Sequence, residues 1–220
     1  MIAGSIEAAC DFVLDWAGVE QALGDDELAR DPSLPSAIRR LASRLGADWL
    51  ERAHPFRVET HPGLYQSLFN IQDHILDPRK PTEDGSYRII LAENQGVWTL
   101  AVGRNDPEAL YAAGDFMDGS EPGWRRFEAC EVEDVLVYVL LSNLIWLSQY
   151  EDDYGNCGDE RTDEIDQLVW SHAAFESFGG FWTDTERTCL HMEGVGVTLP
   201  RRSWPRHGRT WQDHSAKPRI

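Results

Sequence analysis

A run of 13 residues from Val135 to Leu147 is apolar except for Ser142 and Asn143. It lies in a longer pattern that recurs at the spacing of one helix face: Val132, Leu136, Val139, Leu140, Asn143 and Leu147. The other positions are also mostly apolar, so other elements must surround this helix on most of its sides. A membrane span needs about 20 apolar residues, and acidic residues flank this run. We therefore expect a buried central helix.

Two other helices have clear sequence signals. The first runs from Ser5, a plausible N-cap, to about Ala22, and the second runs from Pro35 to a stop at Gly46. Weaker patterns predict a short strand at 56–60, a helix at 61–77, a loop-rich stretch at 103–124, a helix at 163–178 ended by Gly179, and short strands at 181–199 with turns at Gly194 and Gly196.

The clearest local signal is a β-hairpin. Two β-rich runs, 87–92 and 97–102, are separated by Glu93-Asn-Gln-Gly96. Four residues ending in Gly favour a type I turn with Gly96 in the left-handed conformation.

Helices, a hairpin, a helix pair and more strands follow each other without regular alternation. This order predicts an α+β fold, in which a mainly antiparallel sheet with a central hairpin packs against several helices. A chain of 220 residues fits one domain over 1–199, followed by a basic C-terminal tail or extra hairpin over 200–220.

Charge is the strongest functional signal. The chain has 20 basic and 38 acidic residues, a formal net charge of −18, which argues against nucleic-acid binding. Residues 128–166 contain twelve acids and one base, Arg161, whereas residues 200–220 carry six bases and one acid. Acids that follow the central helix oppose its macrodipole, so a role outside folding is expected. Two alternatives stay open: a merely solvated acidic face, and a tail that folds back onto the acidic body.

No catalytic motif stands out. The sequence lacks HExxH, GxSxG, GxGxxG and a phosphate-binding loop, and its His residues are not spaced as metal ligands. Six tryptophans that are candidates for stacking a sugar or base are more typical of a core: Trp49, Trp98, Trp124, Trp146, Trp170 and Trp182. Cysteines at 10, 130, 157 and 189 form no CxxC pair, and the chain does not begin with a signal-peptide pattern. We expect a cytoplasmic protein that is not an enzyme and needs no cofactor or metal.

The stretch Ile89-Ile-Leu-Ala-Glu-Asn-Gln-Gly-Val-Trp-Thr-Leu-Ala-Val102 resembles the central hairpin of the SUKH superfamily. That superfamily includes bacterial toxin-immunity proteins and yeast cell-wall-synthesis regulators. Leu34-Pro35 with the following helix, Asp106-Pro107 and the helix from 132 to 150 match the family in order. The chain departs from it after Asp106-Pro107, where a second Pro or an apolar residue is usual, and in the tail beyond Pro200.

The resemblance implies an α+β domain without catalysis that binds and blocks a cognate toxin, in many cases a nuclease. The charge agrees independently, because a nuclease needs a basic surface that carboxylates can occupy. From charge and exposed aromatics we expect the partner-binding residues to be Glu151, Asp152, Asp153, Tyr154, Asp159, Glu160 and Asp163. The expected partner is a basic toxin domain, not nucleic acid or a membrane. The alternatives are a non-catalytic scaffold of the same fold with a non-toxin partner, and an enzyme with an acidic aromatic cleft.

Overall fold

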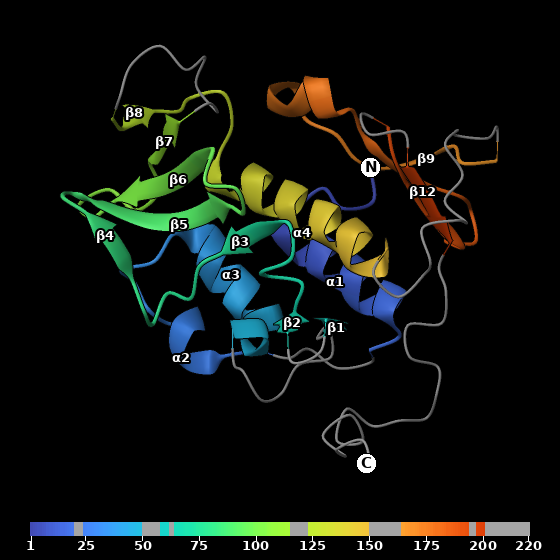
Figure 1. The fold of residues 1–220 in the computed structure, drawn as a ribbon, viewed down its shortest axis with the longest axis horizontal. Coiled ribbons are helices and arrows are strands. Elements are labelled where there is room, and N and C mark those ends of the chain that lie inside the picture. Colours follow the sequence, from blue (N-terminus) through green and yellow to red (C-terminus); the bar gives the residue numbers. More distant parts are fainter. Residues whose placement is uncertain are drawn as a thin grey trace.

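A computed structural model describes residues 1–19, 24–49, 58–61, 64–114, 123–149, 164–193 and 197–200. Three helices pack together at its centre: α1 (Ile6–Ala17), α3 (Ser36–Leu45) and α4 (Val132–Gln149). A six-stranded sheet lies on one side of this group and a four-stranded sheet on the other side of α4 (Figure 1). Both sheets are antiparallel, which confirms the α+β class.

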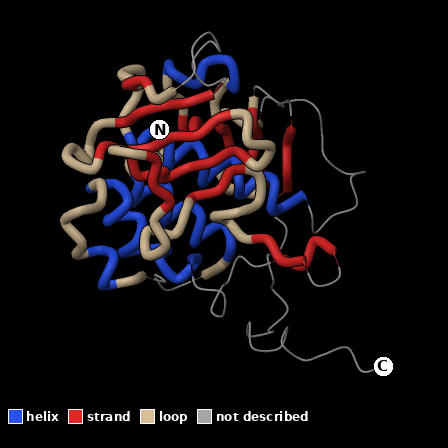
Figure 2. Tube along the Cα trace, turned by 60° about the vertical axis from the view of Figure 1, so that its left-hand side comes forward, coloured by secondary structure: helices blue, strands red, loops and turns tan. Residues whose placement is uncertain are grey.

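The larger sheet has the strand order β3-β5-β6-β7-β8, and β4 also pairs with β5. Its strands cross one side of the helix layer (Figure 2). Their bounds are β3 (Asp73–Ile75), β4 (Thr82–Asp84), β5 (Tyr87–Glu93), β6 (Trp98–Gly103), β7 (Leu110–Gly114) and β8 (Arg125–Arg126).

The smaller sheet has the order β12-β11-β10-β9. It is formed by β9 (Gln167–Trp170), β10 (Phe181–Thr183), β11 (Cys189–Met192) and β12 (Val197–Pro200). The backbone N–H of Ala3 donates to the Val169 carbonyl at 2.8 Å, so the N-terminal segment lies along β9. Shorter elements complete the fold: α2 (Asp26–Ala29), a two-stranded hairpin of β1 (Val58–His61) and β2 (Leu64–Gln66), and the 3₁₀ helices η1 (Gly46–Trp49) and η2 (Ala173–Phe178).

The elements with strong local signals form, although α1 ends at Ala17, before Gly18 at φ 69°, and not at about Ala22 as predicted. The Ser5 hydroxyl accepts the Ala8 N–H at the start of α1, and α3 ends at Gly46. The hairpin turn has Gly96 at φ 73°, and the Glu93 carboxylate accepts the N–H groups of Gln95 and Val97 at 2.8 and 3.1 Å. The glutamate of the E-N-Q-G-V-W motif thus holds the turn closed.

The prediction of a helix at 61–77 is wrong. Leu64, Leu68, Ile71 and Ile75 have helical spacing, but the structure forms β2, a turn and β3 there. Local side-chain bonds compete with a helix, because the Asn70 amide oxygen accepts the Ser67 N–H and the Ser67 hydroxyl accepts the Phe69 N–H.

Two other stretches also differ from prediction. Where one helix was expected at 163–178, the described residues 164–178 form β9 and η2, because β9 pairs with β10 and the His172 ring accepts the Ala174 N–H. The stretch at 103–124, expected to be loop-rich, contains β7, whose buried Leu110 and Ala112 alternate with the more exposed Tyr111. The predicted strand at 56–60 corresponds in part to β1, and Gly194 and Gly196 lie outside the described residues.

Helix α4 is buried around its circumference, as the sequence predicts. Asn143, with no exposed surface, is its main polar contact with the larger sheet. Its amide N–H groups donate to the Leu68 and Asp73 carbonyls at 2.7 and 2.8 Å, and its amide oxygen accepts the Asp73 N–H at 3.1 Å. One side chain therefore satisfies three backbone groups of the segment before β5.

Replacing Asn143 by Leu keeps a similar side-chain volume but leaves these three backbone groups without their partner. We expect the free energy of unfolding to fall by about 2–4 kcal/mol, measured by urea denaturation. Asn94→Leu in the exposed hairpin turn is the matched control and should change it by about 0.5 kcal/mol or less. Equal losses in the two variants would contradict this role for Asn143.

Candidate functional site

The seven predicted partner-binding residues, from Glu151 to Asp163, lie outside the described residues. The structure does describe the segment that follows them. Residues 164–193 carry six acids and one base, Arg187, and include β9, β10 and β11. Five of these acids are exposed: Glu164, Asp166, Glu176, Glu186 and Glu193. We call residues 164–193 the acidic module.

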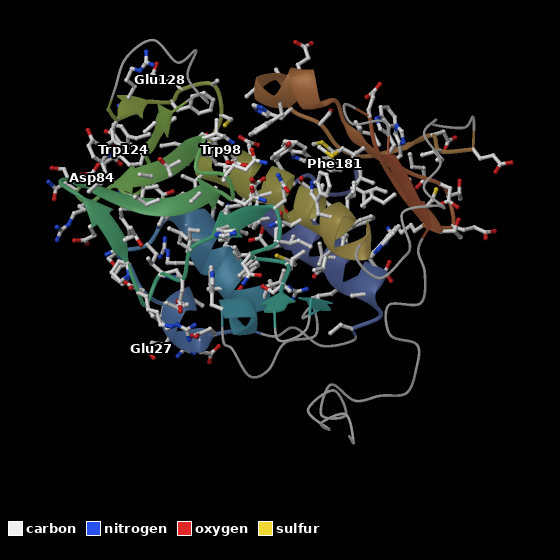
Figure 3. All side chains as sticks on the ribbon, in the orientation of Figure 1. Glu27, Asp84, Trp98, Trp124, Glu128 and Phe181 are labelled. Carbon is white, nitrogen blue, oxygen red and sulfur yellow. The ribbon has the colours of Figure 1, made fainter. Side chains whose placement is uncertain are left out.

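The acidic module is anchored on α4 by an aromatic cluster. Phe181, with no exposed surface, lies between the smaller sheet and α4 (Figure 3). It meets Tyr138 of α4 edge-on, at 5.9 Å between ring centroids, and Tyr138 stacks on Phe175 at 4.6 Å. This cluster fixes the module while its carboxylates face solvent.

One exposed acid of the module is held by a tryptophan. The Glu193 carboxylate accepts the Trp182 indole N–H at 3.2 Å and the Gly180 N–H at 3.3 Å. Trp182 is partly buried, and cross-strand pairing places it beside His191 of β11. Tryptophan is enriched at the energetic centres of protein interfaces, and a cationic side chain can stack on its ring.

The single base of the module forms an ion pair with α1. Arg187 pairs with Asp15 of α1 at 3.1 Å and lies over the Phe12 ring at 5.9 Å. Asp184, in the same turn, accepts the N–H groups of Thr188 and Cys189, and the pKa of its carboxyl is lowered. Burial of Asp184 opposes that shift, which the hydrogen bonds from Thr188 and Cys189 produce.

Arginines elsewhere in the described part are paired in the same way. Its residues comprise 26 acids and 11 bases, and at least seven of these bases form ion pairs within the fold. Arg40 bridges three elements, since it contacts Glu133 of α4 at 2.6 Å and Glu7 of α1 at 3.3 Å. These pairs neutralise some of the acidic side chains, and the remaining acids of the described part outnumber the remaining bases.

The aromatic and sulfur residues considered from sequence fall mostly in the core. Trp170 is buried, Trp98 and Trp146 pack against the core, and the Trp49 indole donates to the Ile75 carbonyl. Burial raises the pKa of the Cys10 and Cys130 thiols to about 12, so both are protonated at neutral pH. Within the described ranges, no three His, Cys, Asp or Glu side chains gather as metal ligands. Nor does any described helix have the length and apolar character needed to cross a membrane.

Sequence reasoning missed one buried acid. Asp73 is only 5% exposed and lies opposite Glu93 in the pairing of β3 with β5. Burial, and secondarily the negative charge of Glu93, raise its pKa to about 7. The nearby Tyr138 phenol also has a raised pKa, first because it is buried and then because of Asp73. A buried carboxyl of this kind carries no sequence signal, because the strand that buries it was not predicted.

Comparison of the chain with protein-family models, curated proteins and solved structures finds no match.

The buried Asp73 predicts an unusual pH dependence of stability. Its folded-state pKa of about 7 exceeds the value of 3.8 for a free side chain, so the folded protein binds this proton more tightly. The stability it contributes is full below about pH 4 and is lost as the pH rises to about 7. Urea denaturation of the wild type and of Asp73→Asn across this range measures the effect.

The Asn variant should match the wild type near pH 4 and exceed its free energy of unfolding by roughly 2–4 kcal/mol at pH 8. Asp77→Asn, in the loop after β3, is the control and should not gain stability as the pH rises, because its carboxylate pairs with Arg79 at 2.9 Å. A constant difference between Asp73→Asn and the wild type at every pH would overturn the assignment.

Proposed function

We propose that this chain is an immunity-type protein that binds and neutralises a basic toxin domain through an acidic surface. That surface comprises the segment from Glu151 to Asp163 and the acidic module that follows it. The observation that carries the proposal is the charge distribution: twelve acids and one base between residues 128 and 166, followed by the exposed acids Glu176, Glu186 and Glu193 in the segments that connect or follow the strands of the smaller sheet.

The proposed mechanism is occupation of a nucleic-acid site. A nuclease holds its polyanionic substrate with Lys and Arg side chains around the active site. Carboxylates at Glu151, Asp152 and Asp153 would pair with these bases and exclude the substrate. Association between opposite charges is fast and weakens with salt, because the attraction is screened beyond about 10 Å at 0.1 M ionic strength.

The ion pairs within the fold support this proposal. Arg187, the one base of the acidic module, pairs with Asp15 and is only partly exposed. A basic partner that approaches the module therefore meets exposed carboxylates around an arginine that is already paired.

In this proposal the chain acts by binding alone, in the cytoplasm, without cofactor or metal. A scaffold with a non-toxin partner would share the fold and the acidic surface. The two functions differ in the effect on the partner, because an immunity protein abolishes the partner's activity.

Capture from lysate of the native host tests the proposal. The wild-type chain should retain one basic protein at about 0.05 M salt and release it at about 0.5 M. Asp152→Lys with Asp153→Lys should lose most of this binding, because the pair reverses two charges at the proposed contact. The captured protein is then assayed for nuclease or other toxic activity with and without the chain.

Asp26→Lys with Glu27→Lys is the matched control, because it makes the same charge change on α2, away from the smaller sheet (Figure 3). Circular dichroism verifies that both double variants fold. Equal loss of binding in the two variants would mean that only net charge matters. A captured partner whose activity is unaffected would favour the scaffold, and no partner at low salt would leave the acidic face as a solvated surface.

A further inference from the structure

Three aromatic side chains lie on the face of the larger sheet that points away from the helices. Tyr87 of β5 and Tyr111 of β7 meet edge-on at 4.8 Å between ring centroids, and Tyr87 contacts Trp124, just before β8, at 5.5 Å. We call Tyr87, Tyr111 and Trp124 the aromatic platform.

Strand register shows which face carries the platform. Val102 and Leu110 are paired, are buried in the core and face the helices. Tyr111 pairs with Ala101, and both alternate with those residues, so they face the opposite side. Ala101 has no exposed surface although it faces away from the core, which places it beneath the platform.

The position of this face in the molecule suits a docking surface. In the described part of the chain, the helices lie behind the larger sheet and the smaller sheet lies beyond α4 (Figures 1 and 2). Solvent-facing positions of an antiparallel sheet are ordinarily polar, whereas here they carry two tyrosines and a tryptophan. Partly exposed Tyr and Trp side chains that are grouped together are typical of interface centres.

Hydrogen bonding fixes the platform and gives it an acidic edge. The Trp124 indole N–H donates to the Asp84 carboxylate at 2.8 Å, and the two residues lie together at the end of the sheet (Figure 3). Asp84 pairs with Tyr87 across β4 and β5, so its carboxylate is positioned beside both rings.

The charges around the platform favour a cationic ligand. Two of the neighbouring arginines form ion pairs, Arg104 with Glu83 at 3.2 Å and Arg126 with Glu128 at 3.5 Å. Asp84 therefore adds a negative charge next to aromatic rings in a chain whose net charge is −18. A guanidinium group satisfies both features, because it stacks on aromatic faces and pairs with a carboxylate. A sugar could stack on the rings and donate a hydroxyl to Asp84, but it would leave the negative charge unpaired, which a guanidinium neutralises.

We propose that the aromatic platform is a second docking surface, which receives an arginine side chain of a basic protein partner. The guanidinium stacks on Trp124 or Tyr87 and pairs with Asp84. The inference rests on the proposed function only in requiring a basic partner; it needs neither a toxin nor the segment from Glu151 to Asp163. A partner that reached both this platform and the acidic module would contact the chain on both sides of α4.

The test is an NMR titration of the full chain with the capped tripeptide Gly-Arg-Gly, following the Trp124 indole N–H signal. The matched probe replaces Arg by citrulline, which has the same shape without the charge. We expect a saturable shift with the arginine peptide, with a Kd on the order of 10 mM for a single side chain. The citrulline peptide should bind at least about fivefold more weakly.

Asp84→Asn keeps the tryptophan signal and should weaken arginine binding by about fivefold, whereas Glu27→Gln removes one charge on α2 and should have no effect. Equal shifts with both peptides, or the same binding by Asp84→Asn and wild type, would overturn the proposal. So would a shift produced by methyl glucoside but not by the arginine peptide. Because no toxin is present, failure here leaves the capture experiment of the proposed function unaffected.

Discussion

The burial of α4 on all sides is the constraint on which the rest of the structure depends. A helix this apolar is stable in water only when other elements cover it, and α1, α3 and strands of both sheets do so. Two polar side chains of α4 then decide how the neighbours are placed. Asn143 holds the backbone of the segment before β5, and Glu133 accepts the Ile6 N–H at 2.7 Å while pairing with Arg40. Helix α4 therefore lies at the centre of the core and also bonds to the segments that pack on either side of it.

The parts of the fold that could be predicted are those whose signal lies in the same few residues as the structure. Ser5 caps its own helix, and Glu93 closes its own turn. The helix predicted from Leu64 to Ile75 is wrong because the apolar spacing fits a helix, whereas the backbone groups bond to Asn143, about 70 residues away. The sequence did not predict β9 for the same reason, because β10 and the N-terminal segment supply its hydrogen bonds.

The candidate surfaces show the same division. An excess of acid can be counted in a sequence, but the internal pairing of the bases cannot, because Arg187 and Asp15 are 172 residues apart. The sequence favours Trp124 as a core aromatic. In the structure, the strand register places Tyr87 and Tyr111 on the outer face, and the contact of the Trp124 ring with Tyr87 places Trp124 there too. The sequence therefore indicates the sign of a partner's charge, whereas the strand register indicates where an aromatic contact can form.

The acids around α4 do not all need the same explanation. At its N-terminal end, Glu133 bonds to the Ile6 N–H and to Arg40, and Asp134 accepts the Glu131 N–H at 3.0 Å. These acids also complement the positive end of the helix dipole, so folding alone accounts for them. Glu151, Asp152 and Asp153 follow the other end, where negative charge is unfavourable. A basic partner would reverse that cost on binding, so these three acids favour a binding role more strongly than an equal number of acids elsewhere.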